Sequence, residues 1–262
     1  MIDKEGLTRH IVNLDDKIMA IRTLDKAESV LKNYIPRYTD FFDPYQISLC
    51  THALHRIAGL KYIVTGGREG AERQIIMLYP EFMEDMEIEN PLRVLKLEGK
   101  LGGDSFTHRD VLGAILGLGI KREKIGDIIA GNGRAYVVSF KEICDFIQWN
   151  LEKISRYKVT ANFVDFCDIE EHEESYKLIE STVPSLRLDA VIGVGFGESR
   201  SSLSKLINND RVKVNWKPIN NPAHPVQEGD VISFKGKGRM ILLQVGNKTK
   251  KDRYQVIIKR MI

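Results

Sequence analysis

The sequence predicts an α+β protein with three domains, and three observations lead to this class. The chain has 262 residues, more than one domain usually holds. Hydrophobic residues make up 43% of it, which permits packed cores and argues against a disordered chain. Segments with the three- and four-residue apolar spacing of helices are followed along the chain by short segments typical of strands.

Residues 1–80 are predicted to form a mainly helical domain. Leu24, Ala27, Val30 and Leu31 have helical spacing, and this helix should end before Pro36, because proline disfavours helix in the preceding residue. A second helical face spans residues 47–57. Short strands are expected at 62–64 and 75–79, on either side of a glycine turn.

Residues 81–168 are predicted to form a domain with the element order β-α-β-β-α-β. Strands are expected at 92–97, 127–130, 135–138 and 159–166. Helices are expected from Thr107 and over 141–154, the latter with Ile143, Phe146, Ile147 and Leu151 facing inward. This order is that of ferredoxin-like and RNA-recognition-motif folds. Tyr136 and Phe140 are the aromatic residues of its third strand, so protein contact or scaffolding is as well supported as base stacking.

Residues 181–262 are predicted to form a small α+β domain. A helix begins near Leu186, and Ser199 caps a second helix over Arg200–Asn208. Strands are expected at 212–214, 230–234, 240–245 and 254–259. Glycines at 193, 195 and 197 lack the GxGxxG spacing of a nucleotide site and predict a turn between the two helices.

The net charge of +3 conceals an uneven distribution. Residues 181–262 contain 15 Lys or Arg and six Asp or Glu, a charge of +9, which leaves 24 basic and 30 acidic residues, or −6, on the rest. The acidic run at 165–174 is interpreted as a solvated linker. A domain of this charge favours a polyanionic partner.

Several function classes lack their sequence signals. No apolar run is long enough to span a membrane, the first residues do not form a secretory signal, and a cytoplasmic protein is expected. Cys50, Cys144 and Cys167 are too far apart to suggest disulfides or a metal site, and His52 and His55 lack a third ligand. No catalytic residue, cofactor or metal is predicted, because GxSxG, Walker and HExxH motifs are missing.

Polar residues of the third domain form the strongest constellation. Ser199 at a helix start leaves N–H groups that attract phosphate, and Arg200 can bind it with two hydrogen bonds. Lys205 can share the helix face of Ser201, and Lys213 shares a strand side with Asn215. The alternative is an ordinary capped helix with solvated charges.

This spacing resembles the S-four RNA-binding domain over residues 182–245. The departures are Asp210, where the family usually has glycine, and Leu203, where it has a small residue. The resemblance implies binding of structured RNA, and the expected RNA-binding residues are Arg187, Ser199, Arg200, Ser201, Ser202, Lys205, Asn208, Arg211, Lys213, Asn215, Lys235, Lys237 and Arg239.

Two further segments resemble the bacterial YlmH family: Gly66–Arg73 and residues 106–127 with their LGLGIKREKIGD core. The first is interpreted as a positioned turn, with RNA contact by Arg68 and Arg73 as the rival hypothesis. The resemblance implies a helical domain, an RNA-recognition-like domain and an RNA-binding domain. It also implies binding of ribosomal RNA and tRNA on the large ribosomal subunit, in quality control of obstructed nascent chains. A monomer is expected.

Two other functions remain open. Arg187-Leu188-Asp189 resembles the catalytic motif of pseudouridine synthases, which would make the protein an RNA-modifying enzyme. However, this trio lies in the expected RNA-binding helix and lacks the surrounding glycine and threonine pattern. The third hypothesis is a cell-division adaptor, because an older label of the YlmH family refers to division.

Overall fold

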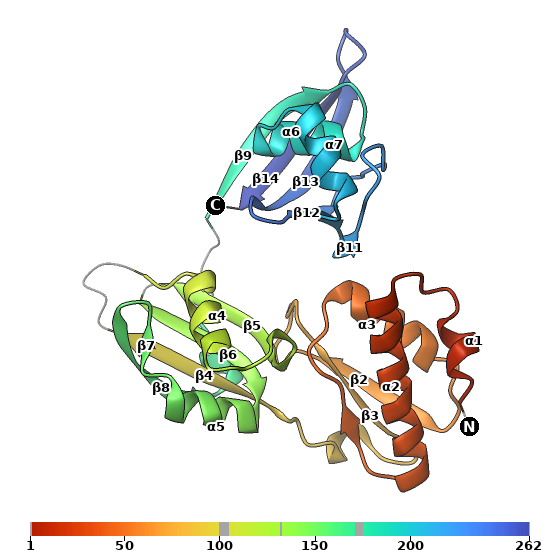
Figure 1. The fold of residues 1–262 in the computed structure, drawn as a ribbon, viewed down its shortest axis with the longest axis vertical. Helices are drawn as coiled ribbons and strands as arrows, with labels where there is room; N and C mark the ends of the chain where they lie inside the picture. Colours follow the sequence, from red (N-terminus) through yellow and green to blue (C-terminus); the bar gives the residue numbers. More distant parts are fainter. Residues whose placement is uncertain (1, 100–104, 132, 171–174, 262) are drawn as a thin grey trace. The chain divides into compact units, whose positions relative to one another are not determined.

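The computed structural model describes residues 2–99, 105–131, 133–170 and 175–261, except for the side chains of Arg200 and Ser201 (Figure 1). The chain divides into two compact units, Met1–His172 and Glu173–Ile262. We describe each unit by itself. The further division of the first unit into two domains near residue 80 stays a prediction.

The first part of unit 1 is a helical layer on a small sheet. The helices are α1 (Lys4–Thr8), α2 (Leu14–Asn33) and α3 (Pro44–Leu54). The antiparallel sheet has the order β1 (Arg37–Tyr38), β3 (Ile75–Pro80), β2 (Leu60–Thr65). Asn13 caps α2 and Asp43 forms a capping box with Gln46 at α3, which fixes where both helices begin. Leu24 and Ala27 pack with Ile76 and Leu78 of β3 in one core.

The second part of unit 1 has the predicted β-α-β-β-α-β order, with one additional two-residue strand, β7, before the last strand. Its elements are β4 (Leu92–Gly99), α4 (His108–Gly117), β5 (Ile125–Gly131), β6 (Arg134–Phe140), α5 (Lys141–Asn150), β7 (Lys153–Ile154) and β8 (Tyr157–Val164). The sheet order is β5-β6-β4-β8-β7 with antiparallel neighbours, which is the ferredoxin-like arrangement. Three short 3-10 helices, Asp85–Glu87, Arg122–Lys124 and Phe166–Asp168, lie in the connections.

Helix α5 differs from its prediction in length and facing. It ends at Asn150 rather than at residue 154, because the chain turns into β7. Phe146, expected to face inward, is 45% exposed, while Cys144 and Ile147 are buried. Ile147 and Leu151 were also expected to face inward and are buried, and Ile143 packs against the core, so Phe146 is the one member of the predicted row that is wrong.

The two faces of the sheet in the second part bury different partners. Leu95 and Leu97 of β4 pack in the core that includes residues of α4 and α5. The opposite face, including Tyr136 and Phe140 of β6, packs against Phe41 in the first part of unit 1. Tyr136 is 1% exposed and Phe140 5%, so neither ring is available to stack on a base. This sheet face is an internal interface of unit 1.

Unit 2 contains one six-stranded antiparallel sheet with two helices on one face (Figure 1). The helices are α6 (Leu188–Phe196) and α7 (Arg200–Asn208), as predicted. The strands are β9 (Tyr176–Val183), β10 (Val212–Val214), β11 (Lys217–Pro218), β12 (Val231–Phe234), β13 (Gly238–Lys248) and β14 (Tyr254–Met261), in the order β11-β10-β12-β13-β14-β9. The predicted strands are all present, and the sequence did not predict β9, which pairs with β14 along its whole length.

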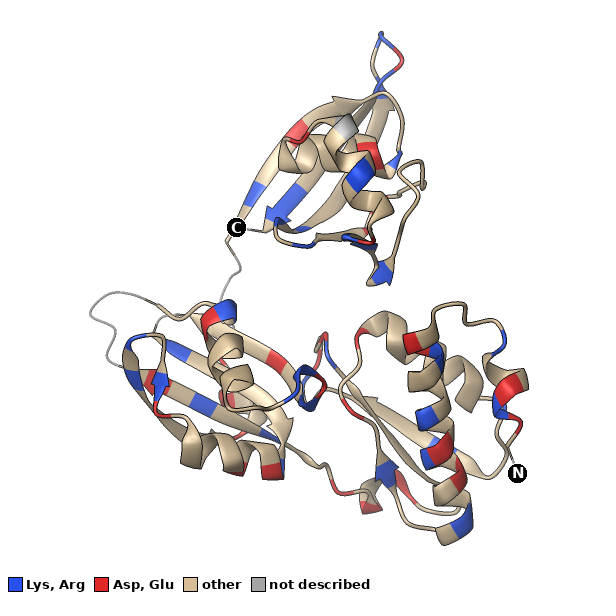
Figure 2. Ribbon diagram, viewed as in Figure 1, with Lys and Arg blue, Asp and Glu red and all other residues tan. Residues whose placement is uncertain are grey.

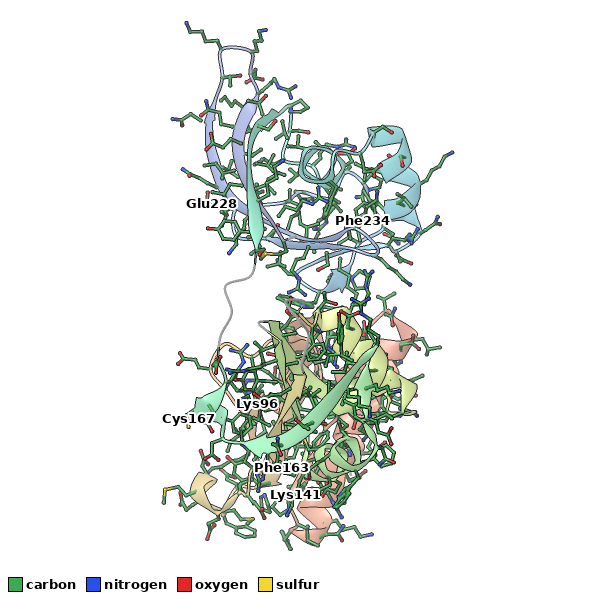
Figure 3. The ribbon with its side chains drawn as sticks, turned by 90° about the vertical axis from the view of Figure 1, so that its left-hand side faces the viewer. Lys96, Lys141, Phe163, Cys167, Glu228 and Phe234 are labelled. Carbon is green, nitrogen blue, oxygen red and sulfur yellow. The ribbon has the colours of Figure 1, made fainter. Side chains whose placement is uncertain are left out.

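The glycines at 193–197 lie mostly inside α6, where a turn was predicted. A Cβ at Gly195 would approach Met240 Sδ to 2.2 Å, so glycine permits close packing of the helix on β13. Gly197, with φ of 70°, ends the helix in the left-handed conformation. Phe234 of β12 fills the interior between sheet and helices, with its ring 5.5 Å from Phe196 (Figure 3).

Candidate nucleic-acid interface

The start of α7 presents the capped helix end that the sequence predicts. Ser199 has extended backbone, and its side chain accepts a hydrogen bond from the N–H of Ser202 at 3.3 Å. Leu203 and Ile207 anchor the helix in the core, whereas Lys205 and Asn208 are exposed. The partial positive charge at this end attracts anions such as phosphate. Arg200 and Ser201 are also predicted to contact RNA, and their side chains lie outside the described part of the structure.

The turn between β12 and β13 brings two more cations, Lys235 and Lys237, beside α7, and Arg211 follows that helix (Figure 2 colours Lys and Arg blue). The N–H of Lys235 donates to the carbonyl of Arg211 at 2.9 Å, just after the helix. Lys237 Nζ lies 2.5 Å from Glu198 Oε1, just before the helix. The turn therefore touches segments on both sides of α7. Arg211, Lys235 and Lys237 are all exposed, so they form one basic surface along α7, with Lys237 near its start and Arg211 and Lys235 near its end.

A cross-strand row continues this surface onto the outer face of the sheet. Lys213 of β10 is paired with Ser233 of β12, and Ser233 with Arg239 of β13. Directly opposite residues of antiparallel strands share a face. The neighbouring Val212 and Phe234 are buried under the helices, so Lys213 and Arg239 point to the other side.

Two predicted contact residues also have partners within the fold. Arg187 donates from Nε and Nη2 to the carboxylate of Asp189, at 3.1 and 2.8 Å, and this hydrogen bonding raises the pKa of Arg187. Asn215 donates to Asp230 Oδ1 at 2.8 Å and accepts from the N–H of Val231 at 2.9 Å. Arg187 keeps an exposed side chain that can contact phosphate, whereas the amide of Asn215 is used to shape a turn.

That turn contains a residue that sequence reasoning missed. Val214 pairs with Lys217, so Asn215 and Trp216 form a two-residue hairpin loop. Both have left-handed backbone, with φ of 47° and 63°. The Trp216 ring lies 5.6 Å from the guanidinium of Arg239, at the end of the row described above. The sequence did contain a signal for this residue. Trp216 directly follows Asn215 between two short strands, a place where an Asn-Gly pair would normally form the turn.

Arg68 and Arg73 hold the parts of unit 1 together. Arg73 donates to the carbonyls of Ile125 and Phe41, at 3.0 and 2.8 Å, and burial lowers its pKa. Arg68 Nη2 lies 3.5 Å from Asp127 Oδ2, and its side chain is 23% exposed. This geometry supports the positioned-turn interpretation, and we leave both residues out of the candidate interface.

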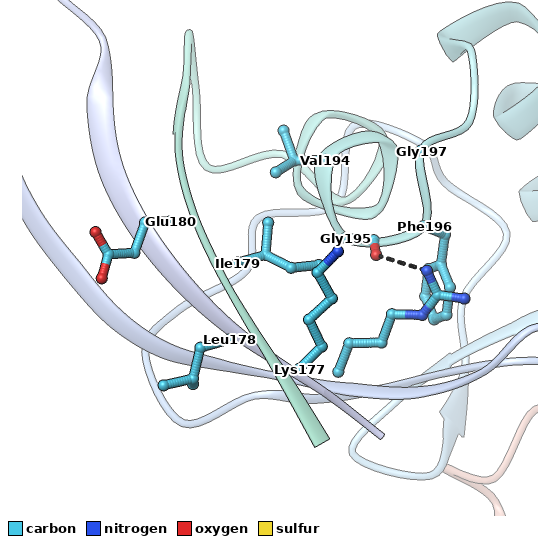
Figure 4. Close-up of a pocket in the computed structure, with 9 residues that line it drawn as sticks. Lys177, Leu178, Ile179, Glu180, Val194, Gly195, Phe196 and Gly197 are labelled. Atoms are coloured by element: carbon cyan, nitrogen blue, oxygen red, sulfur yellow. Dashed lines mark hydrogen bonds between the residues drawn. The ribbon is translucent and has the colours of Figure 1, made fainter. Parts of the chain in front are cut away.

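An open groove of unit 2 lies between β9 and the end of α6 (Figure 4). Arg260 and Lys177 contribute its cations. Arg260 donates to the carbonyl of Gly195 at 3.5 Å and lies over the ring of Phe196 at 5.0 Å. A helix C-terminus carries partial negative charge, so Arg260 stabilises the end of α6 there. This groove is accordingly less suited to phosphate than the start of α7.

No group of three or more His, Cys, Asp or Glu residues that could hold a metal ion occurs in the part of the chain that the structure describes. Within those same ranges, no helix has the length and apolar character needed to cross a membrane.

Family models match three segments of the chain. They are "YlmH, N-terminal" over residues 16–82, "Putative RNA-binding domain in YlmH" over 92–168, and "S4 domain" over 186–232. The S4 match contains α7 and Arg211, whereas Lys235 and Lys237 lie just beyond it.

Individual proteins resemble either the whole chain or its S4 segment. "Ribosome-associated protein quality control protein P2" of Bacillus subtilis is 32% identical over 94% of this chain and 95% of its own length. "Small ribosomal subunit protein uS4" of Brevibacillus brevis is 38% identical over 27% of this chain and 34% of its own. The solved structure of "Cell division protein ylmH from Streptococcus pneumoniae" has a TM-score of 0.53 and 22% identity, and covers 60% of this chain and 96% of that one, which shows a shared fold.

Proposed function

The chain belongs to the YlmH family, and from this premise we propose that it is a non-catalytic protein that binds structured RNA of the ribosome. The observation that carries the proposal is the basic surface of unit 2, in which Lys237 lies near the capped start of α7 and Arg211 and Lys235 lie near its end. A helix start and exposed cations along the helix suit phosphate contacts, which position a protein on RNA without reading its sequence.

We propose the large ribosomal subunit and tRNA as the RNA partners. The relative from Bacillus subtilis is named for ribosome-associated quality control, and this chain matches nearly all of it. The proposed role is to hold obstructed complexes of nascent chain and tRNA on that subunit, as a monomer in the cytoplasm. The shape of folded RNA, recognised through phosphates, would direct the binding.

The enzyme hypothesis loses support from the geometry around Asp189. The Asp189 side chain is 7% exposed, its carboxylate accepts two hydrogen bonds from Arg187, and its N–H donates to the carbonyl of Pro222. A catalytic carboxylate must reach the reacting base, and this one is turned into the fold. We therefore propose a structural role for it at the start of α6.

An adaptor function is a second candidate, because unit 1 exposes apolar side chains on an acidic segment. Phe82 is 70% and Met86 97% exposed, and Phe82 lies 5.6 Å from the ring of Tyr34. Five acidic residues occur within residues 81–90, which would repel RNA and favour a basic protein. Phe82→Ser with Met86→Ser should then weaken protein contacts while the affinity for RNA stays unchanged.

Binding measurements on the full chain test the main proposal. We expect it to bind purified large subunits and tRNA, with affinity falling steeply as salt rises from about 50 to about 200 mM. Lys235→Ala with Lys237→Ala should weaken binding by about tenfold or more and reduce the salt dependence.

The matched control is Lys250→Ala with Lys251→Ala, two exposed lysines at the turn between β13 and β14. This pair removes the same charge from a different hairpin and should change the affinity little. The proposal fails if the protein binds neither subunits nor tRNA at low salt, or if the control pair weakens binding as much as the first pair.

A further inference from the structure

The outer face of the unit 2 sheet has a row of side chains that crosses five strands. Lys213, Ser233 and Arg239 occupy β10, β12 and β13. Met240 of β13 pairs with Arg260 of β14, so the next residue of β14, Met261, extends the row toward Tyr176 of β9, with which it pairs. Both helices of unit 2 pack on the inner face, where the alternate residues are buried. The row contains two cations, and an aromatic residue lies at its β9 end.

An aromatic ring and a cation are paired at two places along this row, at Arg239 in its middle and at Tyr176 at its β9 end. The Arg239 guanidinium lies 5.6 Å from the centroid of the Trp216 ring, and Lys259 Nζ lies 4.3 Å from that of Tyr176. Tyr176 is 49% exposed and Trp216 is partly exposed. Such cation–π contacts fix the orientation of a ring and place positive charge beside it.

The backbone of Trp216 is held in a conformation that bulky residues rarely adopt. Its φ is 63°, in a two-residue hairpin turn for which glycine is the favoured second residue. The turn is held by Asn215, which bonds to Asp230 and Val231. Strained backbone that persists because its surroundings enforce it is typical of functional positions. Here it presents an indole ring beside the cation row.

From this arrangement we propose that the outer face binds unpaired RNA bases, with Trp216 and Tyr176 as stacking platforms. Lys213, Arg239 and Lys259 supply phosphate partners along the same face. Aromatic rings beside basic side chains are how proteins hold single-stranded nucleic acid, because every base has a face that can stack. The inference rests on the proposed RNA binding and adds a substrate class to it: RNA with unpaired nucleotides next to a folded region.

Trp216 is also the reporter for the test. The chain has two tryptophans, so Trp149→Phe in the full-length protein leaves Trp216 as the single source of indole fluorescence. The probe is an oligouridine of about ten nucleotides, within the usual length of a single-strand site. We expect its addition to quench the fluorescence, and a fully paired RNA of similar charge to quench it much less.

A variant of Trp216 removes the indole ring while leaving the hairpin turn in place. Trp216→Gly creates an Asn-Gly turn, which suits the left-handed backbone, so the hairpin should persist. We expect it to bind oligouridine about tenfold more weakly than the Trp149→Phe protein, and Tyr176→Leu to have a similar effect. Both variants should bind fully paired RNA as the parent does.

The outcomes distinguish this inference from the proposed function. If the parent protein binds tRNA or large subunits but oligouridine leaves Trp216 fluorescence unchanged, the outer face does not stack bases and the proposed function stands. The inference is also overturned if Trp216→Gly binds oligouridine with unchanged affinity. If that variant binds oligouridine normally but no longer binds subunits, this face is assigned to a protein partner instead. If the parent binds no RNA at low salt, the proposed function itself fails.

Discussion

Asn215 Nδ2 donates a hydrogen bond to Asp230 Oδ1 at 2.8 Å, and this contact joins the β10–β11 turn to the start of β12. The other oxygen of Asp230 accepts from the N–H of Gln227, also at 2.8 Å. Asp230 is 6% exposed, so one buried carboxylate organises two connections of unit 2. The position of Trp216, and with it the outer-face row, depends on this pair.

Replacing Asp230 by alanine should therefore loosen unit 2. The amide of Asn215 and the N–H of Gln227 would lose their acceptor, at a cost of about 2–4 kcal/mol in the free energy of unfolding. Hydrogen exchange followed by mass spectrometry should show faster exchange over residues 212–234 and unchanged exchange in unit 1. Equal protection of that segment in the variant would show that the pair does not hold the turn.

Asp127 joins two segments of unit 1, as Asp230 joins two connections of unit 2. Its carboxylate accepts from the N–H groups of Glu72 and Arg73, each at 2.9 Å, and so attaches the loop of the first part to β5. Asp127→Ala should lower the free energy of unfolding by about 2–4 kcal/mol, measured by urea denaturation. Glu170→Gln is the control, because Glu170 pairs with Arg134 at the surface and its loss should cost under about 1 kcal/mol. Similar costs for the two variants would contradict the prediction.

Two glycines of unit 1 should respond oppositely to alanine. A Cβ at Gly126 would lie 2.6 Å from the ring of Phe41 and 3.1 Å from the carbonyl of Val138, so Gly126→Ala should destabilise by about 1–3 kcal/mol. Gly113, inside α4, has open space around its Cβ position, so Gly113→Ala should stabilise by about 0.5–1 kcal/mol. Melting temperatures of the two variants test this, and a stable Gly126→Ala would mean that β5 and Phe41 are not in close contact.

The three cysteines should differ in reactivity. Burial raises the pKa of Cys50 to about 11 and that of Cys144 to about 12, whereas Cys167 is exposed. At a pH of about 8 the buried thiols remain protonated, and only the thiolate is alkylated. Mass spectrometry should find label on Cys167 in the native protein, and on Cys50 and Cys144 only after denaturation.

The same shifts define a pH dependence of stability. Below about pH 9 both thiols are protonated in the folded and unfolded chains, so the contribution of Cys50 and Cys144 to the free energy of unfolding does not change with pH. As the pH rises above 9 toward the folded-state values, only the unfolded chain releases these protons. Stability should then fall by about 1.4 kcal/mol per pH unit for each thiol, and Cys144→Ala should reduce that slope.

Local patterns sufficed for most elements of the fold. Caps such as Ser199 and Thr107, and the glycine turn between β5 and β6, act within a few residues, so they can be read along the chain. The sequence pattern did not predict strand β9, because it is an edge strand with mostly exposed side chains and shows little alternation of apolar and polar residues. Phe146 was misplaced because apolar character does not tell which helix row meets the sheet.

The sequence by itself determined the charge separation, the capped helix of unit 2 and the order of nearly all elements, because these depend on residue type and short spacing. Tertiary structure alone decided which side chains meet. It buried Tyr136 and Phe140 in an internal interface, engaged Arg73 there, and aligned Lys213 with Arg239 and Tyr176 on one sheet face. These outcomes depend on contacts between distant segments, and strand register, which sets them, is not encoded in any short stretch of the chain.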